Sequence, residues 1–315
     1  MYRWISFWPD TAALNAVVVN NLYVAELALA CLIVVTIIVM MLTFCIRYRY
    51  GSIASRAGRI AKTWHWEIVW TTATLGGFLI LFIYGAQVYI WLYQAPAGDE
   101  EIYVVGKQWM WKAEHPGGQR EINALHVPVD KTIRVVMASD DVIHSFFIPA
   151  FRVKRDVVPG TLETIWFKPT KTGTFKFACT QFCGLQHAGM TGEVTVMPAA
   201  DYEGWLVEQG VHESLAQQGE RLFRAHGCSG CHGANSVVHS PSLEGLYGTF
   251  VHMQDGSVRL ADEAYLRDCI LNPRSFTVAG YPPLMPDFSG QLDEGDVLKL
   301  IAYIKSLGRK GGAGR

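Results

Sequence analysis

Two pairs of cysteines, each followed closely by a histidine, are the side chains in this sequence best suited to chemistry. The first pair lies in CTQFCGLQHAGM, which brings together Cys179, Cys183, His187 and Met190. The runs GTFKF before this segment and GEVTV after it predict strands, so the segment is expected to be a loop at one end of a sheet. Thiolate, imidazole and thioether together are soft ligands that suit copper, whereas zinc has little use for a thioether.

A second imidazole is expected from His144, which lies in DVIHSFFIPAF at the end of another predicted strand. Structural zinc bound by two cysteines and two histidines is the main alternative, because the cysteine spacing also falls within the zinc range. A disulfide is a further alternative, since paired cysteines in an exported domain are often bridged. The thioether of Met190 favours copper over both.

The second pair lies in CSGCH, where Cys228, Cys231 and His232 form the attachment signature of a c-type haem. In such a site both cysteines bond to the porphyrin and the histidine binds the iron. The adjacent histidine and the helical patterns on both sides separate this motif from redox and zinc CxxC sites. A second axial ligand is expected from Met285 in GYPPLMPDF, a loop stiffened by proline. Met253 is the competitor, but HMQDG has the pattern of an exposed turn.

Two long apolar stretches must anchor the elements that carry these sites. Residues 23–46 contain one charge, Glu26, and residues 68–91 contain none; each reaches roughly 36 Å as a helix, enough to cross a bilayer. Buried core helices are the alternative, but they rarely lack a polar face over such a length. The connector has basic residues and no acidic ones, which places it in the cytoplasm and both chain ends outside. Its cations are Arg47, Arg49, Arg56, Arg59 and Lys62.

The rest of the 315-residue chain changes pattern twice. Short β-branched and aromatic runs separated by Gly, Pro and Asp predict an all-β sandwich or barrel over 96–198. A polar, helix-tolerant connector over 199–212 is expected to tether the next domain, with ends roughly 20 Å apart by random-coil scaling. Amphipathic helices predict an all-α domain over 213–309, before a tail at 310–315. Residues 1–95 then form an N-terminal segment, expected to be retained, and the helical hairpin of a multidomain membrane protein.

Composition excludes several classes of function. The formal net charge of −1 and the pI of about 6.8 give no basis for binding nucleic acid. A hydrophobic content of 50% with 12% aromatic residues excludes a disordered chain. The sequence has no phosphate loop, nucleophile elbow or zincin helix, so it lacks the common signatures of hydrolases.

Residues from about 20 to 198 resemble subunit II of the haem-copper cytochrome c oxidases. In that family a two-helix transmembrane hairpin precedes a cupredoxin barrel that holds a binuclear copper centre, CuA. The resemblance implies that Cys179 and Cys183 bridge two copper ions. It also implies that His144 and His187 supply one imidazole to each ion.

The same resemblance implies that Met190 and the backbone carbonyl of Gln181 are the weaker copper ligands. The family usually has a glutamate in place of Gln181, and its side chain helps to bind magnesium at the junction with subunit I, so a magnesium site is in doubt. GKQWMW resembles the family's aromatic segment, which makes Trp109 the expected point where electrons enter, although such a tryptophan can simply be packing. WHWEIVWTTAT resembles the start of the second helix, which makes Glu67 the expected mouth of a proton path; a solvated flank is the alternative.

Residues 213–309 resemble class I cytochrome c domains, and the fusion resembles the caa-type oxidases. The resemblance implies a respiratory enzyme subunit that passes electrons from an external donor through haem c and CuA to haem a of subunit I, where oxygen reduction drives proton pumping. Subunits I and III are the implied partners, and the donor is cytochrome c or a membrane-bound cytochrome complex. The implied location is the bacterial inner membrane, with both redox domains on the periplasmic side. A subunit of another haem-copper enzyme, such as a nitric oxide reductase, is the alternative.

Overall fold

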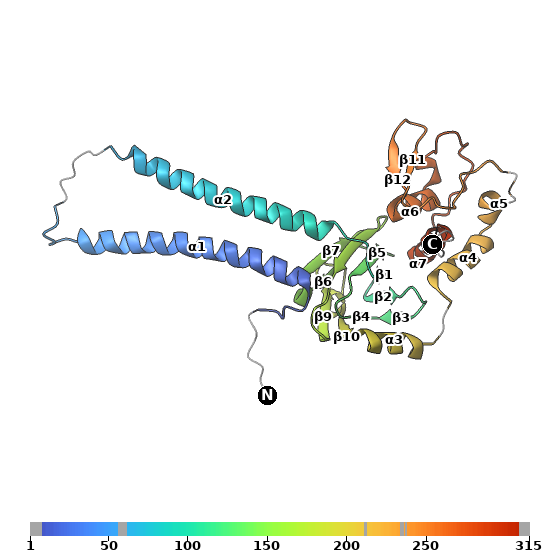
Figure 1. Ribbon diagram of the computed structural model, residues 1–315, viewed down its shortest axis with the longest axis horizontal. Coiled ribbons are helices and arrows are strands. Elements are labelled where there is room, and N and C mark those ends of the chain that lie inside the picture. The colour runs from blue at the N-terminus through green and yellow to red at the C-terminus, as the bar shows by residue number, and fades with distance from the viewer. Residues whose placement is uncertain (1–7, 56–61, 211–212, 234–235, 237, 309–315) are drawn as a thin grey trace, which may run out of the picture. The chain divides into compact units, whose positions relative to one another are not determined.

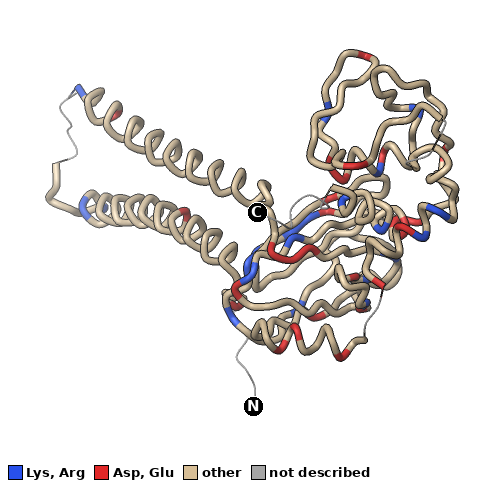
Figure 2. Tube along the Cα trace, turned by 45° about the vertical axis from the view of Figure 1, so that its right-hand side comes forward, with Lys and Arg blue, Asp and Glu red and all other residues tan. Residues whose placement is uncertain are grey.

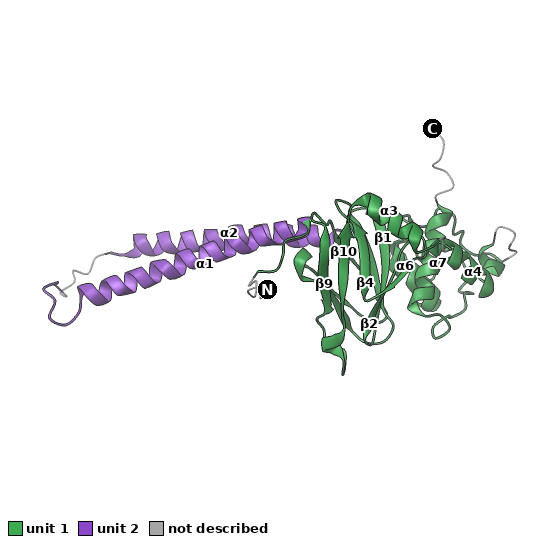
Figure 3. Cartoon of the chain, turned by 90° about the horizontal axis from the view of Figure 1, so that it is seen from below, with its two compact units in different colours: residues 1–13, 95–315 green, residues 14–94 purple. Residues whose placement is uncertain are grey.

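The computed structural model describes residues 8–55, 62–210, 213–233, 236 and 238–308. The chain divides into two compact units (Figure 1, Figure 3). One unit spans residues 14–94, and the other combines residues 1–13 with residues 95–315. The second unit carries both pairs of cysteines.

The unit of residues 14–94 is a pair of helices, α1 (Leu14–Arg47) and α2 (Trp64–Tyr93). Both are long and apolar enough to cross a membrane. The predicted spans, 23–46 and 68–91, lie inside these helices. The helix α1 starts earlier than predicted because its first residues, LNAVVVNNL, are helix-compatible although their asparagines lower the hydropathy.

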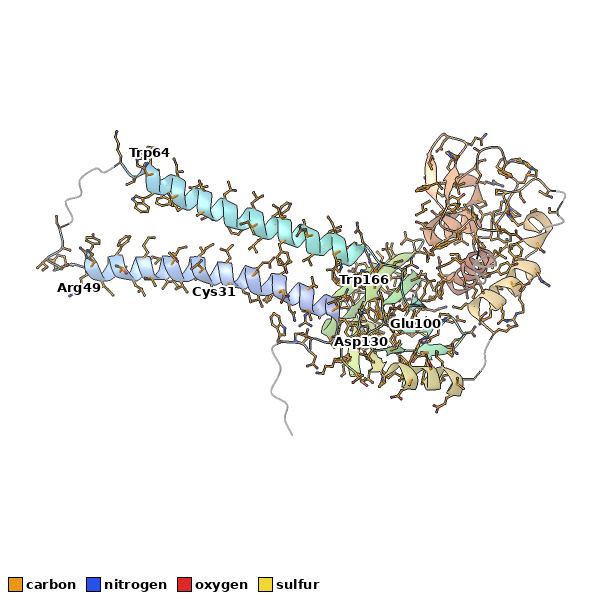
Figure 4. All side chains as sticks on the ribbon, viewed as in Figure 1. Cys31, Arg49, Trp64, Glu100, Asp130 and Trp166 are labelled. Atoms are coloured by element: carbon orange, nitrogen blue, oxygen red, sulfur yellow. The ribbon has the colours of Figure 1, made fainter. Side chains whose placement is uncertain are left out.

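Charged residues are sparse along both helices (Figure 2). Arg49 and Trp64 lie at the loop end of the hairpin, and Cys31 lies part-way along α1 (Figure 4). Of the predicted loop cations, Arg56 and Arg59 fall outside the described residues. The helices approach each other where α2 has glycine: a Cβ at Gly77 would lie 3.6 Å from a methyl group of a leucine on α1. Small residues allow this closeness, which stabilises helix pairs in membranes.

A β-sandwich forms the first part of the other unit, as the sequence predicts. One sheet has the strand order β3-β2-β1-β5-β8 and the other has the order β4-β10-β9-β6-β7. Large buried side chains from both sheets, including Trp111, Phe146, Phe167 and Phe177, form one core. The strands are β1 (Glu100–Lys107), β2 (Met110–Glu114), β3 (Arg120–Ile122), β4 (Ala124–Pro128), β5 (Ile133–Ser139), β6 (His144–Ile148), β7 (Val153–Val157), β8 (Glu163–Phe167), β9 (Gly173–Cys179) and β10 (Thr191–Met197).

The segment just before α1 belongs to this sandwich. The backbone N–H of Ala12 donates to the carbonyl of Ala150 at 3.0 Å, and Thr170 N–H donates to the carbonyl of Ala12 at 2.9 Å. Ala13 forms an isolated bridge with Pro169, and Ala12 and Ala13 are fully buried. The chain therefore leaves the sandwich at Ala13, forms the hairpin and returns to the sandwich at residue 95.

Helices dominate the C-terminal part, also as predicted. Its helix α4 (Leu215–Ala225) packs against α7 (Glu294–Leu307), and the close approach requires Gly219, where a Cβ would lie 2.0 Å from the Lys299 carbonyl oxygen. A side-chain cap begins α7, because Asp293 accepts a hydrogen bond from the backbone N–H of Asp296. The other elements are α5 (Ser229–His232), β11 (Phe250–His252), β12 (Val258–Leu260), α6 (Glu263–Leu271) and the 3₁₀ turn Pro273–Ser275.

The connector is not the flexible tether that its composition predicted. Residues Ala199–Glu208 form the helix α3, which is fastened to the sandwich. The hydroxyl of Tyr202 lies 3.0 Å from His115 Nδ1, and Trp205 stacks on the ring of His126 with centroids 4.5 Å apart. Buried aromatic contacts of this kind outweigh the polar sequence of the helix, so the tether prediction is wrong over the described part of the connector.

Glu121 lies between His115 and His126, the two histidines that α3 contacts, and binds both. Its carboxylate accepts hydrogen bonds from His115 Nε2 at 2.8 Å and from His126 Nδ1 at 2.6 Å. Burial opposes ionisation, but these hydrogen bonds lower the pKa of Glu121 from 4.5 to about 2. A carboxyl whose pKa falls on folding stabilises the fold above its unfolded pKa, and the contribution disappears as the pH drops toward the folded pKa.

Glu121→Gln should therefore destabilise the chain at neutral pH by about 3 kcal/mol, the free energy that corresponds to this pKa shift. The loss should shrink between pH 4.5 and pH 2, where the wild-type carboxylate becomes protonated. Thermal unfolding followed by tryptophan fluorescence at several pH values measures this. Glu220→Gln, in an exposed pair with Arg224, is the control and should unfold as the wild type does. An equal loss of stability in both variants would contradict the conclusion that the buried Glu121 carboxylate stabilises the fold.

Candidate metal and haem centres

The predicted copper ligands meet at one end of the second sheet. Cys179 is the last residue of β9, and Met190 immediately precedes β10. The neighbouring strand β6 begins at His144, so its imidazole reaches the same end of the sheet. Strand pairing thus brings together residues that lie far apart in the sequence.

Around the first thiol, three donor atoms gather. Cys179 Sγ lies 3.8 Å from Cys183 Sγ, 3.9 Å from His144 Nδ1 and 3.2 Å from the carbonyl oxygen of Gln181. The two sulfurs are free thiols, far beyond the bond length of about 2.05 Å in a disulfide. The disulfide alternative is therefore not formed here.

The second thiol has its own pair of donors. Cys183 Sγ lies 3.5 Å from His187 Nδ1 and 3.7 Å from Met190 Sδ. His144, Cys179, Cys183 and Met190 are all buried, which protects the cluster from water. The other four predicted ligands therefore lie around the two cysteine sulfurs, with one imidazole and one weak donor beside each.

This donor set fits two copper ions better than one zinc ion. Structural zinc takes four ligands in a tetrahedron, and it does not need a thioether or a carbonyl. Burial and the neighbouring thiol of Cys179 raise the pKa of Cys183 to about 11, so the Cys183 thiol is protonated at neutral pH until a metal displaces the proton. Two soft ions that share both thiolates would use all six donors.

Asp141, which no sequence motif marks, orients one of the predicted copper ligands, His144. Its Oδ1 lies 2.8 Å from His144 Nε2, and this contact leaves Nδ1 facing the thiols. Partial burial opposes ionisation of Asp141, but hydrogen bonds from the Gln108 N–H and from His144 lower its pKa. Gly106 allows the imidazole to lie close to β1, because a Cβ there would be 3.0 Å from the ring.

Trp109 contacts the loop of the copper site directly. Its indole Nε1 donates to the carbonyl oxygen of Cys183 at 3.2 Å, and Gln108 Nε2 donates to the same oxygen at 2.8 Å. The side chain is partly buried against the sandwich core. A short path therefore runs from the indole through one hydrogen bond to the backbone of a thiol ligand.

The second cysteine pair opens into an apolar cavity of the C-terminal part. Cys228, Cys231 and His232 lie in its wall, and Met285 lies in the wall as well. His232 Nδ1 lies 3.0 Å from the carbonyl oxygen of Pro241, which fixes the ring and leaves Nε2 available for a metal. The remaining wall is apolar, as a porphyrin requires, and includes Phe223, Leu266, Leu300 and Ile304.

The competing methionine, Met253, is buried, although its HMQDG sequence suggested that it would be exposed. Met253 has only 4% of its surface exposed, because it packs into the core of the C-terminal part and its backbone bridges Val278. Met253 does not line the cavity that holds His232. The turn itself is present, since Gln254, Asp255 and Gly256 are exposed between β11 and β12, but Met253 at its start is buried. Its absence from the cavity wall favours Met285 as the second ligand.

Comparison with known proteins matches both parts of this unit. Residues 119–197 match the family model "Cytochrome C oxidase subunit II, periplasmic domain". Residues 216–308 match the family model "Cytochrome c". The chain belongs to the cytochrome c oxidase subunit II family. Its cupredoxin-like sandwich and its helical cytochrome c domain are the folds that the sequence resemblance implied.

Individual relatives carry the same description. Cytochrome c oxidase subunit 2 of Alkalihalophilus pseudofirmus is 30% identical over 67% of this chain and 62% of its own length. Alternative cytochrome c oxidase subunit 2 of Bradyrhizobium diazoefficiens is 28% identical over 58% of this chain and 77% of its own length. A crystal structure of the periplasmic domain of subunit II from Bradyrhizobium japonicum is 35% identical, with a TM-score of 0.36, and matches 37% of this chain and 96% of that one.

The predicted proton-path residue of this subunit II lies in the hairpin. Glu67 is in the first turn of α2, and its carboxylate accepts a hydrogen bond from the hydroxyl of Thr63 at 2.7 Å. The side chain is exposed in the isolated chain. It is therefore available to a partner subunit.

Proposed function

We propose that this chain is the subunit II of a caa-type oxidase in the bacterial inner membrane, where it passes electrons from an external donor through haem c and CuA to haem a of subunit I. Oxygen reduction and proton pumping then take place in the partner. Subunit I and subunit III are the proposed partners, and cytochrome c or a membrane-bound cytochrome complex is the proposed donor. Both redox domains face the periplasm.

The gathering of six donors, two neighbouring thiols and the four groups around them, is the observation that carries the proposal. A centre with two soft ions and shared thiolates suits one-electron transfer, and so does a haem with sulfur and imidazole ligands. The described residues contain no other cluster of three or more metal-ligating His, Cys, Asp or Glu side chains, so oxygen reduction is assigned to a partner. Magnesium at Gln181 stays in doubt, because a carboxamide binds that ion less well than a carboxylate.

The chain's own residues prepare these sites. Asp141 holds the imidazole of His144 with Nδ1 toward the thiols, and the Pro241 carbonyl does the same for His232. The thiols of Cys179 and Cys183 are buried and the wall of the cavity is mainly apolar, which limits rearrangement of solvent when charge moves. The indole of Trp109 reaches the copper loop through the Cys183 carbonyl.

Metal analysis with an absorption spectrum of the purified complex tests the proposal. We expect about two copper ions and one covalent haem per chain, together with a partner that contains haem a and consumes oxygen. Zinc without copper would overturn the assignment of the first site. Turnover of nitric oxide rather than oxygen would identify the alternative enzyme.

Glu67→Gln should slow oxygen turnover of the complex without changing the spectrum of either metal centre. The carboxylate at a membrane edge can take up and release a proton, whereas the carboxamide cannot. Steady-state oxygen uptake and the absorption spectrum are compared with those of the wild type. Unchanged turnover would identify Glu67 as a solvated flank of the helix.

A further inference from the structure

Two neighbouring strands of the first sheet, β1 and β5, are buried on both faces, whereas β2 and β3 alternate. Strand β1 has a run of five buried residues, whereas a sandwich strand with one face in water alternates. Its Ile102 and Val104 face the sandwich core, while Tyr103 and Val105 belong to a separate apolar cluster. That cluster joins the sheet to helices of the cytochrome c domain and consists of Tyr103, Val105, Val136, Ala138, Leu215 and Leu298.

Beside this apolar cluster lie two cations and two anions, which we call the docking cluster. Arg134 on β5 contacts Glu101 at 2.5 Å and Glu263 on α6 at 2.8 Å. Lys305 on α7 contacts Glu101 at 2.6 Å and Glu263 at 2.9 Å. Each charge therefore has two partners of opposite sign. Two of the four contacts, Arg134–Glu263 and Lys305–Glu101, cross between the two domains. Tyr247 adds a hydrogen bond to Glu263 at 2.5 Å.

The docking cluster is shielded from water and remains ionised. Its side chains are 8–25% exposed. Burial opposes the charge of Glu263, but hydrogen bonds from Arg134 and the charge of Lys305 lower its pKa from 4.5 to about 2. Buried ion pairs of this kind contribute less to stability than to the selection of one geometry, because any displaced arrangement leaves charges unpaired.

Helix α7 separates the contact surface from the haem cavity. Leu298, Ala302 and Lys305 recur at helical spacing and face the sheet. Leu300 and Ile304 lie on another stripe of the same helix and line the cavity that contains His232. The helix therefore touches the sheet with one side and the haem site with another.

Strand β1 in turn separates this contact surface from the copper site. Val105 points toward α7, and the next residue, Gly106, lies against the ring of His144 on the opposite face. A single β-layer thus separates the cytochrome c domain from a copper ligand. This arrangement suits electron transfer only while the two domains stay docked.

We propose that the docking cluster, Arg134, Glu101, Lys305 and Glu263, fixes the cytochrome c domain against β1 and β5, so that haem c is positioned behind the copper site rather than carried on a mobile tether. These are positioning residues, and the proposal rests on the proposed function. If these residues hold the domains together, the rate of electron transfer from haem c to copper within one chain should not depend on protein concentration. The rate should also be insensitive to salt while the docking cluster is intact.

Hydroxyl-radical footprinting of the purified full chain tests docking without reference to the cofactors. In the wild type Tyr103, which is 5% exposed, should be protected. Arg134→Gln should raise the labelling of Tyr103 several-fold, because truncating one partner of a buried ion pair shifts such an equilibrium by about thirtyfold or more. Trp111, in the sandwich core, should stay protected in both and thereby report that the domain is folded.

Arg224→Gln is the matched control, because Arg224 pairs only with Glu220 on the exposed side of α4 among the contacts described. It should leave Tyr103 protected. The double variant Arg134→Gln/Glu263→Gln should label less than the sum of the two single variants if the residues act as a pair. Strong labelling of Tyr103 in the wild type would overturn the proposal.

Flash reduction of haem c provides the second readout. In the wild type, electron transfer from haem c to copper should not change with ionic strength, whereas in Arg134→Gln it should become several-fold slower and sensitive to salt. An equal rate in both proteins would also overturn the proposal. Protected Tyr103 in a chain that binds no copper would instead refute only the proposed function.

Discussion

Cys183→Ser should abolish the CuA absorption and leave the haem c bands intact. Cys183 Sγ contacts the other thiol, His187 and Met190, so its removal takes a shared ligand from both ions at once. A serine hydroxyl is a hard, protonated donor and does not replace a thiolate for copper. Copper content should fall toward zero, and electrons should remain on haem c. Absorption spectra and metal analysis of the purified complex measure both quantities.

Cys45→Ser provides the matched control for this experiment. Cys45 is an exposed residue of α1, and no described interaction involves it. The same chemical change at Cys45 should leave the CuA absorption, the haem c bands and the copper content unchanged. If Cys183→Ser also removed the haem bands, the two sites would not fold independently, and the separate assignments would need revision.

Met285→Ala should lower the reduction potential of haem c and remove the absorption band that arises from sulfur bound to iron. A thioether stabilises the reduced iron, and axial ligands set haem potentials over a range of roughly 0.8 V. The expected decrease is a sizeable part of that range. Potentiometric titration of the haem bands, with the oxidised spectrum, measures the change.

Met253→Leu separates this prediction from a general loss of packing. Met253 is buried in the core of the same domain, and leucine keeps a similar volume there. The haem c reduction potential and the absorption spectrum of the Met253→Leu protein should match those of the wild type. The opposite pattern, with a normal Met285→Ala protein and an altered Met253→Leu protein, would move the axial ligand to Met253.

Local patterns made most of both sites predictable. The ligands Cys179, Cys183, His187 and Met190 fall within one loop, and CSGCH within one turn, so spacing alone placed them together. His144 was predictable only because strands end together at one edge of a sheet. The residues that support these ligands were less visible, since Asp141 and the Pro241 carbonyl carry no signal until the chain is folded.

Contacts between distant segments account for the wrong predictions. The composition of the connector indicated a tether, but the partners of Tyr202 and Trp205 are His115, just after β2, and His126 on β4, far away in the sequence. The docking cluster joins Arg134 to Glu263 in the same way. The continuous apolar run of β1 was the one local sign that something covers that strand.

The bonds between Ala12 and both Ala150 and Thr170 also constrain how the protein is made. They make the membrane hairpin an insertion within the copper domain rather than an anchor placed before it. These contacts can form only after the chain has passed through both helices and returned to the sandwich. A fusion partner close to Ala12 would therefore disturb the sandwich as well as the membrane anchor.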